Sequence, residues 1–190
     1  MISSLSTIFD KFCDYLDGKI KWSEQKTGFT KLIFDFFSAN IKEENLIEEK
    51  GYMGVDYILR KKIPAYSTDE IELAIEHEIS YRNPENIIKS EVQHLVDIKA
   101  KYKVGIFYPS TGDEDQFKRE IENKIKQASY LSVPWEEYLF IFGFPTTKEG
   151  KRSILFKAFQ FTWNRQGNYQ NLEAKQLKER VIRQKEVTKI

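Results

Sequence analysis

Three consecutive segments restrict the fold of this chain more than any other feature. Residues 70–78 alternate between apolar and polar side chains, as a half-buried strand does. The Asn-Pro-Glu sequence at 83–85 is a typical helix start, and apolar residues recur after it at spacings of four and three. A second apolar segment at 102–108 indicates another strand. Because a crossover helix joins two parallel neighbouring strands, these segments predict an α/β fold.

Similar patterns extend this prediction over the whole chain. We expect helices over 5–16, 26–37 and from 111, strands over 51–60, 135–142 and 153–163, and a basic helix over about 170–188. The short connection at 61–69 makes strands 51–60 and 70–78 antiparallel neighbours. Without a repeat or a linker, the chain is expected to form one domain, 1–190, with N-terminal helices in 1–40, a mixed sheet in 50–165 and the basic helix in 168–190.

Composition favours a packed protein of the cytoplasm. The chain has 190 residues, of which 41% are hydrophobic and 14% aromatic, and this argues against a disordered chain. No apolar run approaches the roughly 20 residues that cross a bilayer, so we expect no membrane contact. The single cysteine, Cys13, cannot form an internal disulfide. A reducing cytoplasm is therefore the expected compartment.

Charge is balanced overall but uneven along the chain. The net charge is only +1, yet residues 151–190 hold ten Lys and Arg residues and only three Asp and Glu residues. A basic end can contact phosphate groups, and the candidate residues for a nucleic-acid contact are Lys175, Lys178, Arg180 and Arg183. The alternative is that these residues form the solvated face of a helix.

Acidic residues in the strand-like segments form a candidate metal site. Alternation along 71–78 places Glu76 and Glu78 on one face, with Cα atoms about 6.7 Å apart. If Asp56 lies opposite them on the preceding strand, three carboxylates converge and could hold Mg²⁺. The alternative is that the glutamates form the solvent face of an amphipathic strand and that Asp56 lies near a turn.

The opposite face of this strand is apolar. It carries Leu73, Ile75 and His77, and we expect it to pack on the crossover helix. His77 is therefore predicted to be a hydrogen-bonded core histidine, with a role as ligand or base as the alternative. His94, in the crossover helix, is predicted to have a structural role.

Asp56 is expected at the end of one strand, Glu76-His77-Glu78 close the next, and a helix and a strand follow. This order resembles the PD-(D/E)XK nuclease superfamily, which includes many restriction endonucleases. The resemblance covers about residues 20–110. It implies a restriction endonuclease-like mixed sheet flanked by helices on both faces, with Asp56 and Glu76 as metal ligands. The lysine of the family motif is replaced here by Glu78. Some restriction enzymes carry Glu at this position, and members that lost the lysine include inactive ones that only bind.

The chemistry implied by the resemblance is hydrolysis of DNA phosphodiester bonds with Mg²⁺ or Mn²⁺. Asp56, Glu76 and Glu78 would be the catalytic and metal-binding residues, with Glu78 positioning or deprotonating the attacking water. Lys99, Lys101 or Lys103 could supply the missing positive charge. Cutting both strands of a duplex would favour a homodimer. One alternative is an inactive nuclease-fold module that binds DNA or a protein, and another is an unrelated α/β domain with surface acids.

Overall fold

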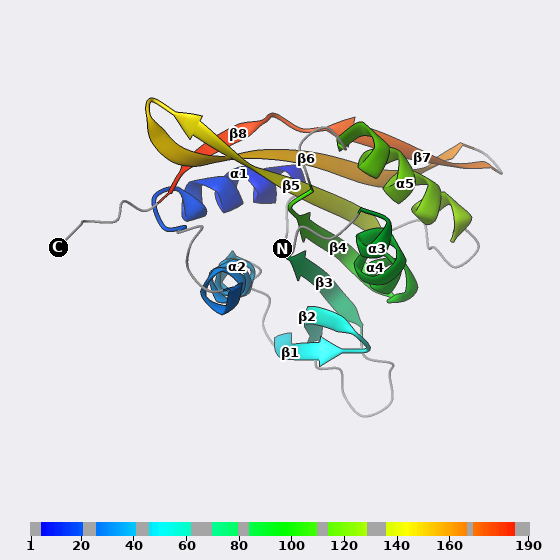
Figure 1. The fold of residues 1–190 in the computed structure, drawn as a ribbon. Coiled ribbons are helices and arrows are strands. Elements are labelled where there is room, and N and C mark those ends of the chain that lie inside the picture. Colours follow the sequence, from blue (N-terminus) through cyan, green and yellow to red (C-terminus); the bar gives the residue numbers. More distant parts are fainter. Residues whose placement is uncertain are drawn as a thin grey trace.

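The computed structural model describes residues 5–20, 26–40, 46–61, 70–79, 84–109, 114–128, 136–166 and 169–184. Within them, one eight-stranded sheet is flanked by helices (Figure 1). The helices are α1 (Leu5–Leu16), α2 (Lys26–Asn40), α3 (Pro84–Ile87), the π-helix η1 (Ile88–Val92), α4 (Gln93–Asp97) and α5 (Glu114–Gln127). The strands are β1 (Leu46–Tyr52), β2 (Val55–Lys61), β3 (Ile71–Glu78), β4 (Ala100–Phe107), β5 (Glu137–Lys148), β6 (Lys151–Gln166), β7 (Tyr169–Gln176) and β8 (Arg180–Arg183).

The sheet is mixed and mostly antiparallel. Its order is β1-β2-β3-β4-β5-β6-β7, and β8 pairs with β6. Strand β4 runs parallel to β3 and to β5, whereas the other neighbours are antiparallel. The segments α3, η1 and α4 follow one another without a break and form the crossover helix between β3 and β4. The predicted α/β class, the antiparallel pairing of β2 with β3 and the parallel pairing of β3 with β4 are confirmed.

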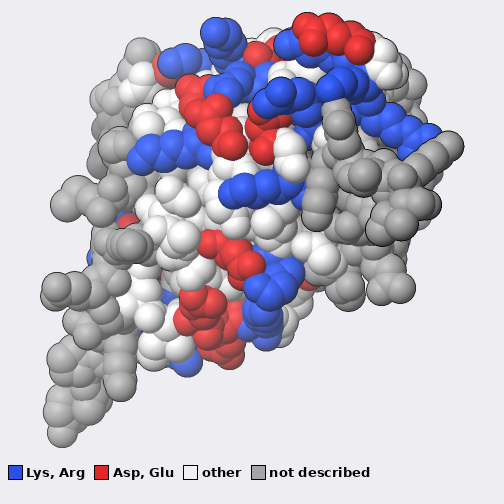
Figure 2. All heavy atoms as spheres, turned by 90° about the vertical axis from the view of Figure 1, so that its left-hand side faces the viewer, with Lys and Arg blue, Asp and Glu red and all other residues white. Residues whose placement is uncertain are grey.

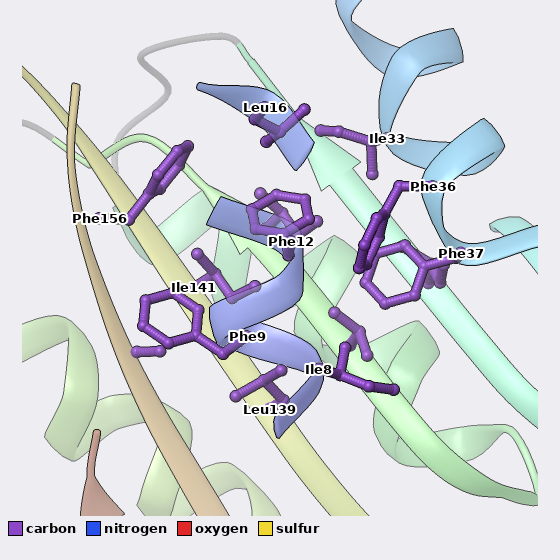
Figure 3. Packing of buried hydrophobic residues seen from close by; sticks show 14 of the residues in the cluster. Ile8, Phe9, Phe12, Leu16, Ile33, Phe36, Phe37, Leu139, Ile141 and Phe156 are labelled. Carbon is purple, nitrogen blue, oxygen red and sulfur yellow. The ribbon is translucent and has the colours of Figure 1, made fainter. Parts of the chain in front are cut away.

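One apolar layer lies between the sheet and the two N-terminal helices. Helix α1 buries its apolar face because apolar residues recur along it at helical spacing. The Phe12 ring lies 5.5 Å from the ring of Phe36 in α2 and 5.6 Å from that of Phe156 in β6. Figure 3 shows Phe12 between these neighbours, with Ile141 of β5 close by. Helix α1 is thereby held against both α2 and the sheet.

A second apolar layer lies on the other face, beneath the crossover helix and α5 (Figure 1). Val92 and Leu95 of the crossover helix are fully buried there, as are Phe117 and Ile121 of α5. The Phe117 ring meets that of Phe107 in β4 at 5.9 Å, edge to face. Both faces of the central strands are therefore covered, which explains why β4 is buried along almost its whole length.

The predicted strand at 51–60 is in fact two strands. A two-residue turn at Met53-Gly54 separates β1 from β2, and Tyr52 pairs with Val55 across it. Met53 has φ 50° and Gly54 φ 86°, the left-handed geometry of hairpin turns whose twist matches that of the flanking strands. The sequence of β1, Leu-Ile-Glu-Glu-Lys-Gly-Tyr, is too polar to resemble a buried strand.

The predicted basic helix over 170–188 is wrong. Residues 169–176 form β7 and 180–183 form β8, while 185–188 lie outside the described residues. Both strands hydrogen-bond to the outer edge of β6, which is 16 residues long. This edge offers unpaired backbone groups that a helix could not satisfy. Strand β5 also extends to Lys148, beyond the predicted 135–142, and Trp135 is not among the described residues.

In the part of the chain that the structure describes, the helices are all too short or too polar to cross a membrane.

Candidate metal centre

The two faces of β3 meet different helices. Leu73 and Ile75 belong to the layer with α1 and α2, whereas Ala74 belongs to the layer with the crossover helix. Alternation then places Glu76 on the side of the crossover helix. The prediction that the apolar face packs on that helix is therefore wrong. Periodicity shows which residues share a face, but not which helix covers it.

Asp56 and Glu76 come together across β2 and β3. Tyr57 is paired with Ile75 in this antiparallel ladder, so the next position brings Asp56 opposite Glu76. Their carboxyl groups lie within hydrogen-bonding reach. The backbone N–H of His77 also donates to Asp56 Oδ2 at 2.9 Å. Asp56 is therefore held in place beside Glu76 by the strand that carries Glu76.

Glu76 is an acid in an unfavourable position for a charge. Its side chain is 0% exposed, and its Oε2 atom is buried without a hydrogen-bond donor among the described residues. Burial raises the pKa of Glu76 to about 10, with further increases from the nearby carboxylates of Asp56 and Glu91. Two carboxylates can hydrogen-bond only by sharing a proton. The pair therefore requires either that proton or a cation to offset the buried charge.

The crossover helix adds two more ligand types next to Glu76. His94 Nδ1 and Glu76 Oε1 share a hydrogen bond of 3.0 Å, and Glu91 Oε2 lies 3.9 Å from the same nitrogen. One ligand atom from each of Glu76, Glu91 and His94 can be chosen so that all three lie within 4.8 Å of one another. We call these three residues, which could hold a metal ion, the metal centre.

Local backbone features bring these side chains together. Glu91 lies in the π-helix η1, a form of helix that occurs frequently at functional sites. Gly54, in the turn between β1 and β2, lies under the His94 ring, and a Cβ atom there would be 3.2 Å from Cε1 and Nε2 of the imidazole. The absence of a side chain at Gly54 leaves room for the ring.

Glu91 was not predicted as a site residue, and His94 was predicted to have a structural role. The available signal was the Glu-x-x-His spacing at 91–94, which places both side chains on one face of a helix. That signal became meaningful only once the acidic face of β3 was known to lie under this helix. The structure therefore assigns His94 to the neighbourhood of Glu76.

Glu78 is the last residue of β3 and is half-buried. Alternation puts it on the same side as Glu76, but it is not part of the metal centre. Of the candidate lysines, Lys99 is exposed. Lys101 forms an ion pair with Glu72 at 2.8 Å. Neither Lys99 nor Lys101 therefore places a buried, unpaired ammonium group beside Glu76.

Lys103 is fully buried on β4, on the face that carries the crossover helix. Its Nζ atom lies 3.0 Å from Glu136 Oε2 and 3.1 Å from the hydroxyl of Tyr138. Burial lowers the pKa of Lys103 to about 8, although Glu136 opposes this change. The lysine is therefore held by partners on or next to β5. On β4 it lies two residues before Gly105, the residue that pairs with Glu76.

His77 has the structural role that was predicted. Its ring bonds to Thr30 Oγ1 through Nδ1 at 3.0 Å and to the Tyr108 hydroxyl through Nε2 at 3.3 Å. Burial lowers the pKa of His77 to about 3, so the ring is neutral at physiological pH. The predicted hydrogen-bonded core histidine is confirmed, on the side of α2 and away from the metal centre.

The predicted nucleic-acid residues occupy β7, β8 and the connection between them. Arg180 forms ion pairs with Asp10, at 2.8 Å, and with Asp14, both on α1. Arg183 forms one with Asp17 at 2.7 Å. Lys175 and Lys178 are exposed.

Figure 2 views the molecule from the left of Figure 1 and shows blue and red side chains interspersed, with a largely uncharged band between two charged regions. The ion pairs of Arg180 and Arg183 show that basic residues of the C-terminal segment serve in part to hold β8 against α1.

Comparison with models of known protein families gives no match for this chain, and neither does comparison with curated protein sequences.

Proposed function

We propose that this chain is a metal-dependent deoxyribonuclease that hydrolyses DNA phosphodiester bonds beside Asp56 and Glu76. The observation that carries the proposal is the position of Glu76, a fully buried acid with an unsatisfied oxygen, held against a second acid. A divalent cation would remove the repulsion between these carboxylates. Such an arrangement is costly to maintain without a function.

The order of elements supports the same proposal. Helices are followed by the antiparallel strands β1, β2 and β3, then by the crossover helix and by β4 parallel to β3. This is the order expected of a restriction endonuclease-like core. Glu76 lies near the end of β3, where the PD-(D/E)XK resemblance implies a metal ligand, whereas Asp56 lies near the start of β2 and not at the end of a strand as that resemblance implies.

In the proposed reaction the protein positions both the scissile phosphate and the attacking water. Asp56 and Glu76 would hold Mg²⁺ or Mn²⁺, and a cation bound there would lower the pKa of a water and stabilise negative charge on the phosphate. Glu78, on the same side of β3, would orient or deprotonate the water. Lys175 and Lys178 are exposed and available for backbone phosphates. A homodimer would allow both strands of a duplex to be cut.

Nicking of supercoiled plasmid DNA in the presence of Mg²⁺ or Mn²⁺ tests this proposal. We expect the wild type to nick the plasmid and both Asp56→Asn and Glu76→Gln to lose this activity. Glu72→Gln is the matched control, because Glu72 is a buried acid on the same face of β3 but pairs with Lys101 and Lys61. Its activity should remain near that of the wild type. Equal nicking by wild type and Glu76→Gln would refute the proposal.

A second candidate function is DNA or protein binding without cleavage. It is favoured by Glu78 at the position where the family has a lysine, and by the pairing of Lys101 and Lys103 with Glu72 and Glu136. Gel-shift titrations at several salt concentrations distinguish the two functions. DNA that is bound with a steep salt dependence but never cut would favour this candidate.

A further inference from the structure

We infer that the metal centre of Glu76, Glu91 and His94 binds a transition-metal ion such as Zn²⁺ or Co²⁺ in preference to Mg²⁺, with a nitrogen ligand supplied by the crossover helix. This inference rests on the metal-binding half of the proposed function, and it does not depend on whether DNA is hydrolysed. It extends the proposed acid pair of Asp56 and Glu76 to a mixed site between a strand and a helix, with Glu76 shared by both.

The spacing of the ligand atoms suits one ion. Two ligands that each lie about 2.0–2.2 Å from a zinc ion can be at most about 4.4 Å apart. The distance from His94 Nδ1 is 3.0 Å to Glu76 Oε1 and 3.9 Å to Glu91 Oε2. Both fall below that limit, and all three residues offer ligand atoms within 4.8 Å of one another. An ion would take the place of the hydrogen bond between His94 Nδ1 and Glu76 Oε1 and draw the ligands slightly closer together.

The types of ligand decide the preference. Mg²⁺ selects oxygen ligands in a regular octahedron and retains several waters. A neutral imidazole nitrogen instead suits Zn²⁺ and neighbouring transition metals. Two carboxylates and one neutral imidazole also balance the charge of a divalent ion. Catalytic zinc sites likewise use three protein ligands of the His and Glu type and leave the fourth position to water.

Burial shows that the centre is directed inward on one side and open on the other. Glu76 Oε2 is buried and has no donor among the residues that the structure describes, so one face of the site already offers an unsatisfied acceptor. The side chain of His94 is 37% exposed. Solvent therefore reaches the helix side of the centre, where an ion could enter and a water ligand could remain.

The imidazole is also held in place before any ion binds. Its Nδ1 atom shares a hydrogen bond of 3.0 Å with Glu76 Oε1, and the missing side chain at Gly54 leaves room for the ring beside the turn between β1 and β2. Glu91 Oε1 lies 2.9 Å from the hydroxyl of Ser90, whose one proton it shares with the Asn86 carbonyl oxygen at 2.7 Å, and this contact helps to orient the second carboxylate. Ligands that are oriented in advance lose less entropy on binding.

Isothermal titration of the full chain with ZnCl₂, CoCl₂ and MgCl₂ tests the inference. We expect one Zn²⁺ or Co²⁺ per chain, bound at least tenfold more tightly than Mg²⁺. Loss of outer-shell partners alone costs 10–100-fold in affinity, so His94→Asn should weaken Zn²⁺ and Co²⁺ binding by at least about tenfold. Its effect on Mg²⁺ should be less than about twofold. The visible absorption of bound Co²⁺ should change in the same variant.

Two further variants make the result specific. Glu91 is a partly exposed helix residue, and Glu91→Gln should also weaken Zn²⁺ binding. This variant tests the same metal centre if His94→Asn does not fold. Gln93→Ala is the control, because Gln93 bonds to Asp97 on the same helix and not to the centre. Its affinities should match those of the wild type.

The outcomes separate this inference from the proposed function. Unchanged Zn²⁺ affinity in His94→Asn, equal affinity of the wild type for Mg²⁺ and Zn²⁺, or no binding of any ion would each overturn it. Zn²⁺ binding that depends on His94, without plasmid nicking, would leave the inference intact and remove the hydrolysis. Nicking with Mg²⁺ together with a Zn²⁺ affinity that is unchanged in His94→Asn would overturn the inference and leave the proposed hydrolysis intact.

Discussion

The carboxylate of Asp56 is fixed by the backbone of the residue that follows Glu76. Asp56 Oδ2 accepts a hydrogen bond from the His77 N–H at 2.9 Å. Because His77 and Glu76 point to opposite sides of β3, this bond orients Asp56 toward Glu76 while the His77 ring stays in the core with α2. One strand thus combines a polar centre on one side with a structural histidine on the other.

Glu76 should make the metal-free protein less stable as pH rises. Its native pKa of about 10 lies above the ordinary 4.5, so the folded state binds more protons than the unfolded state between these values. The contribution of Glu76 to the free energy of unfolding is therefore at its maximum below pH 4.5 and is lost as the pH rises toward 10. Urea unfolding in EDTA between pH 6.5 and 7.5 should show a loss of up to about 1.4 kcal/mol in the wild type. The same decrease in Glu76→Gln would contradict this assignment.

His77 should have the opposite pH dependence. Its native pKa of about 3 lies below the ordinary 6.5, so the unfolded state takes up the proton first. Its contribution is complete above pH 6.5 and decreases toward pH 3, by up to about 1.4 kcal/mol per unit. Relative to His77→Gln, whose amide does not titrate, the wild type should therefore lose additional stability between pH 6 and 4.5 in urea titrations. Parallel curves for the two proteins would show that the imidazole is not buried in its neutral form.

Gly54→Ala should weaken metal binding as well as the fold. The added Cβ would lie 3.2 Å from the His94 ring, and the φ of +86° is strained for alanine. We expect a loss of about 1 kcal/mol or more in unfolding free energy and reduced Zn²⁺ affinity in calorimetry.

Gly150→Ala is the matched control for this substitution. It carries a similar strain at φ +73° with no atom within 4 Å of the new Cβ. Gly150→Ala should lose stability but bind Zn²⁺ like the wild type. Equal affinities for the two alanine variants would mean that Gly54 does not position His94.

Phe12→Ala should be one of the most destabilising core substitutions. Its side chain is fully buried and contacts aromatic rings from both α2 and β6. Replacement of a buried Phe by Ala costs about 3–5 kcal/mol. Met53→Ala, at a residue that is 75% exposed, should change the unfolding free energy by less than about 0.5 kcal/mol. Urea denaturation monitored by circular dichroism measures both, and a loss below about 1 kcal/mol for Phe12→Ala would contradict the packing of α1.

Local patterns were sufficient for the elements whose periodicity is strong. The apolar spacing of α1 and α2, the Asn-Pro-Glu start of the crossover helix and the apolar run of β4 all identified their elements correctly. The pairings β2 with β3 and β3 with β4 followed from the lengths and types of the connections. These features depend on residues close together in the chain, and the sequence displays them directly.

The C-terminal strands show where local patterns fail. Residues 170–183 have the composition of a solvated basic helix, yet they form β7 and β8 because β6 offers them an edge to pair with. Likewise, β1 is a strand because the Met53-Gly54 turn folds it back onto β2. In both cases the deciding hydrogen bonds come from another segment, which outweighs weak intrinsic preference.

The sequence by itself determined which side chains share a face of β3 and that Asp56 lies on the strand beside it. Only the tertiary structure decided that the crossover helix covers the acidic face, and so brought Glu91 and His94 to Glu76. The physical reason is that both sides of this strand are covered by helices. Alternation distinguishes the two sides, but the burial of the whole apolar surface determines which helix each side meets.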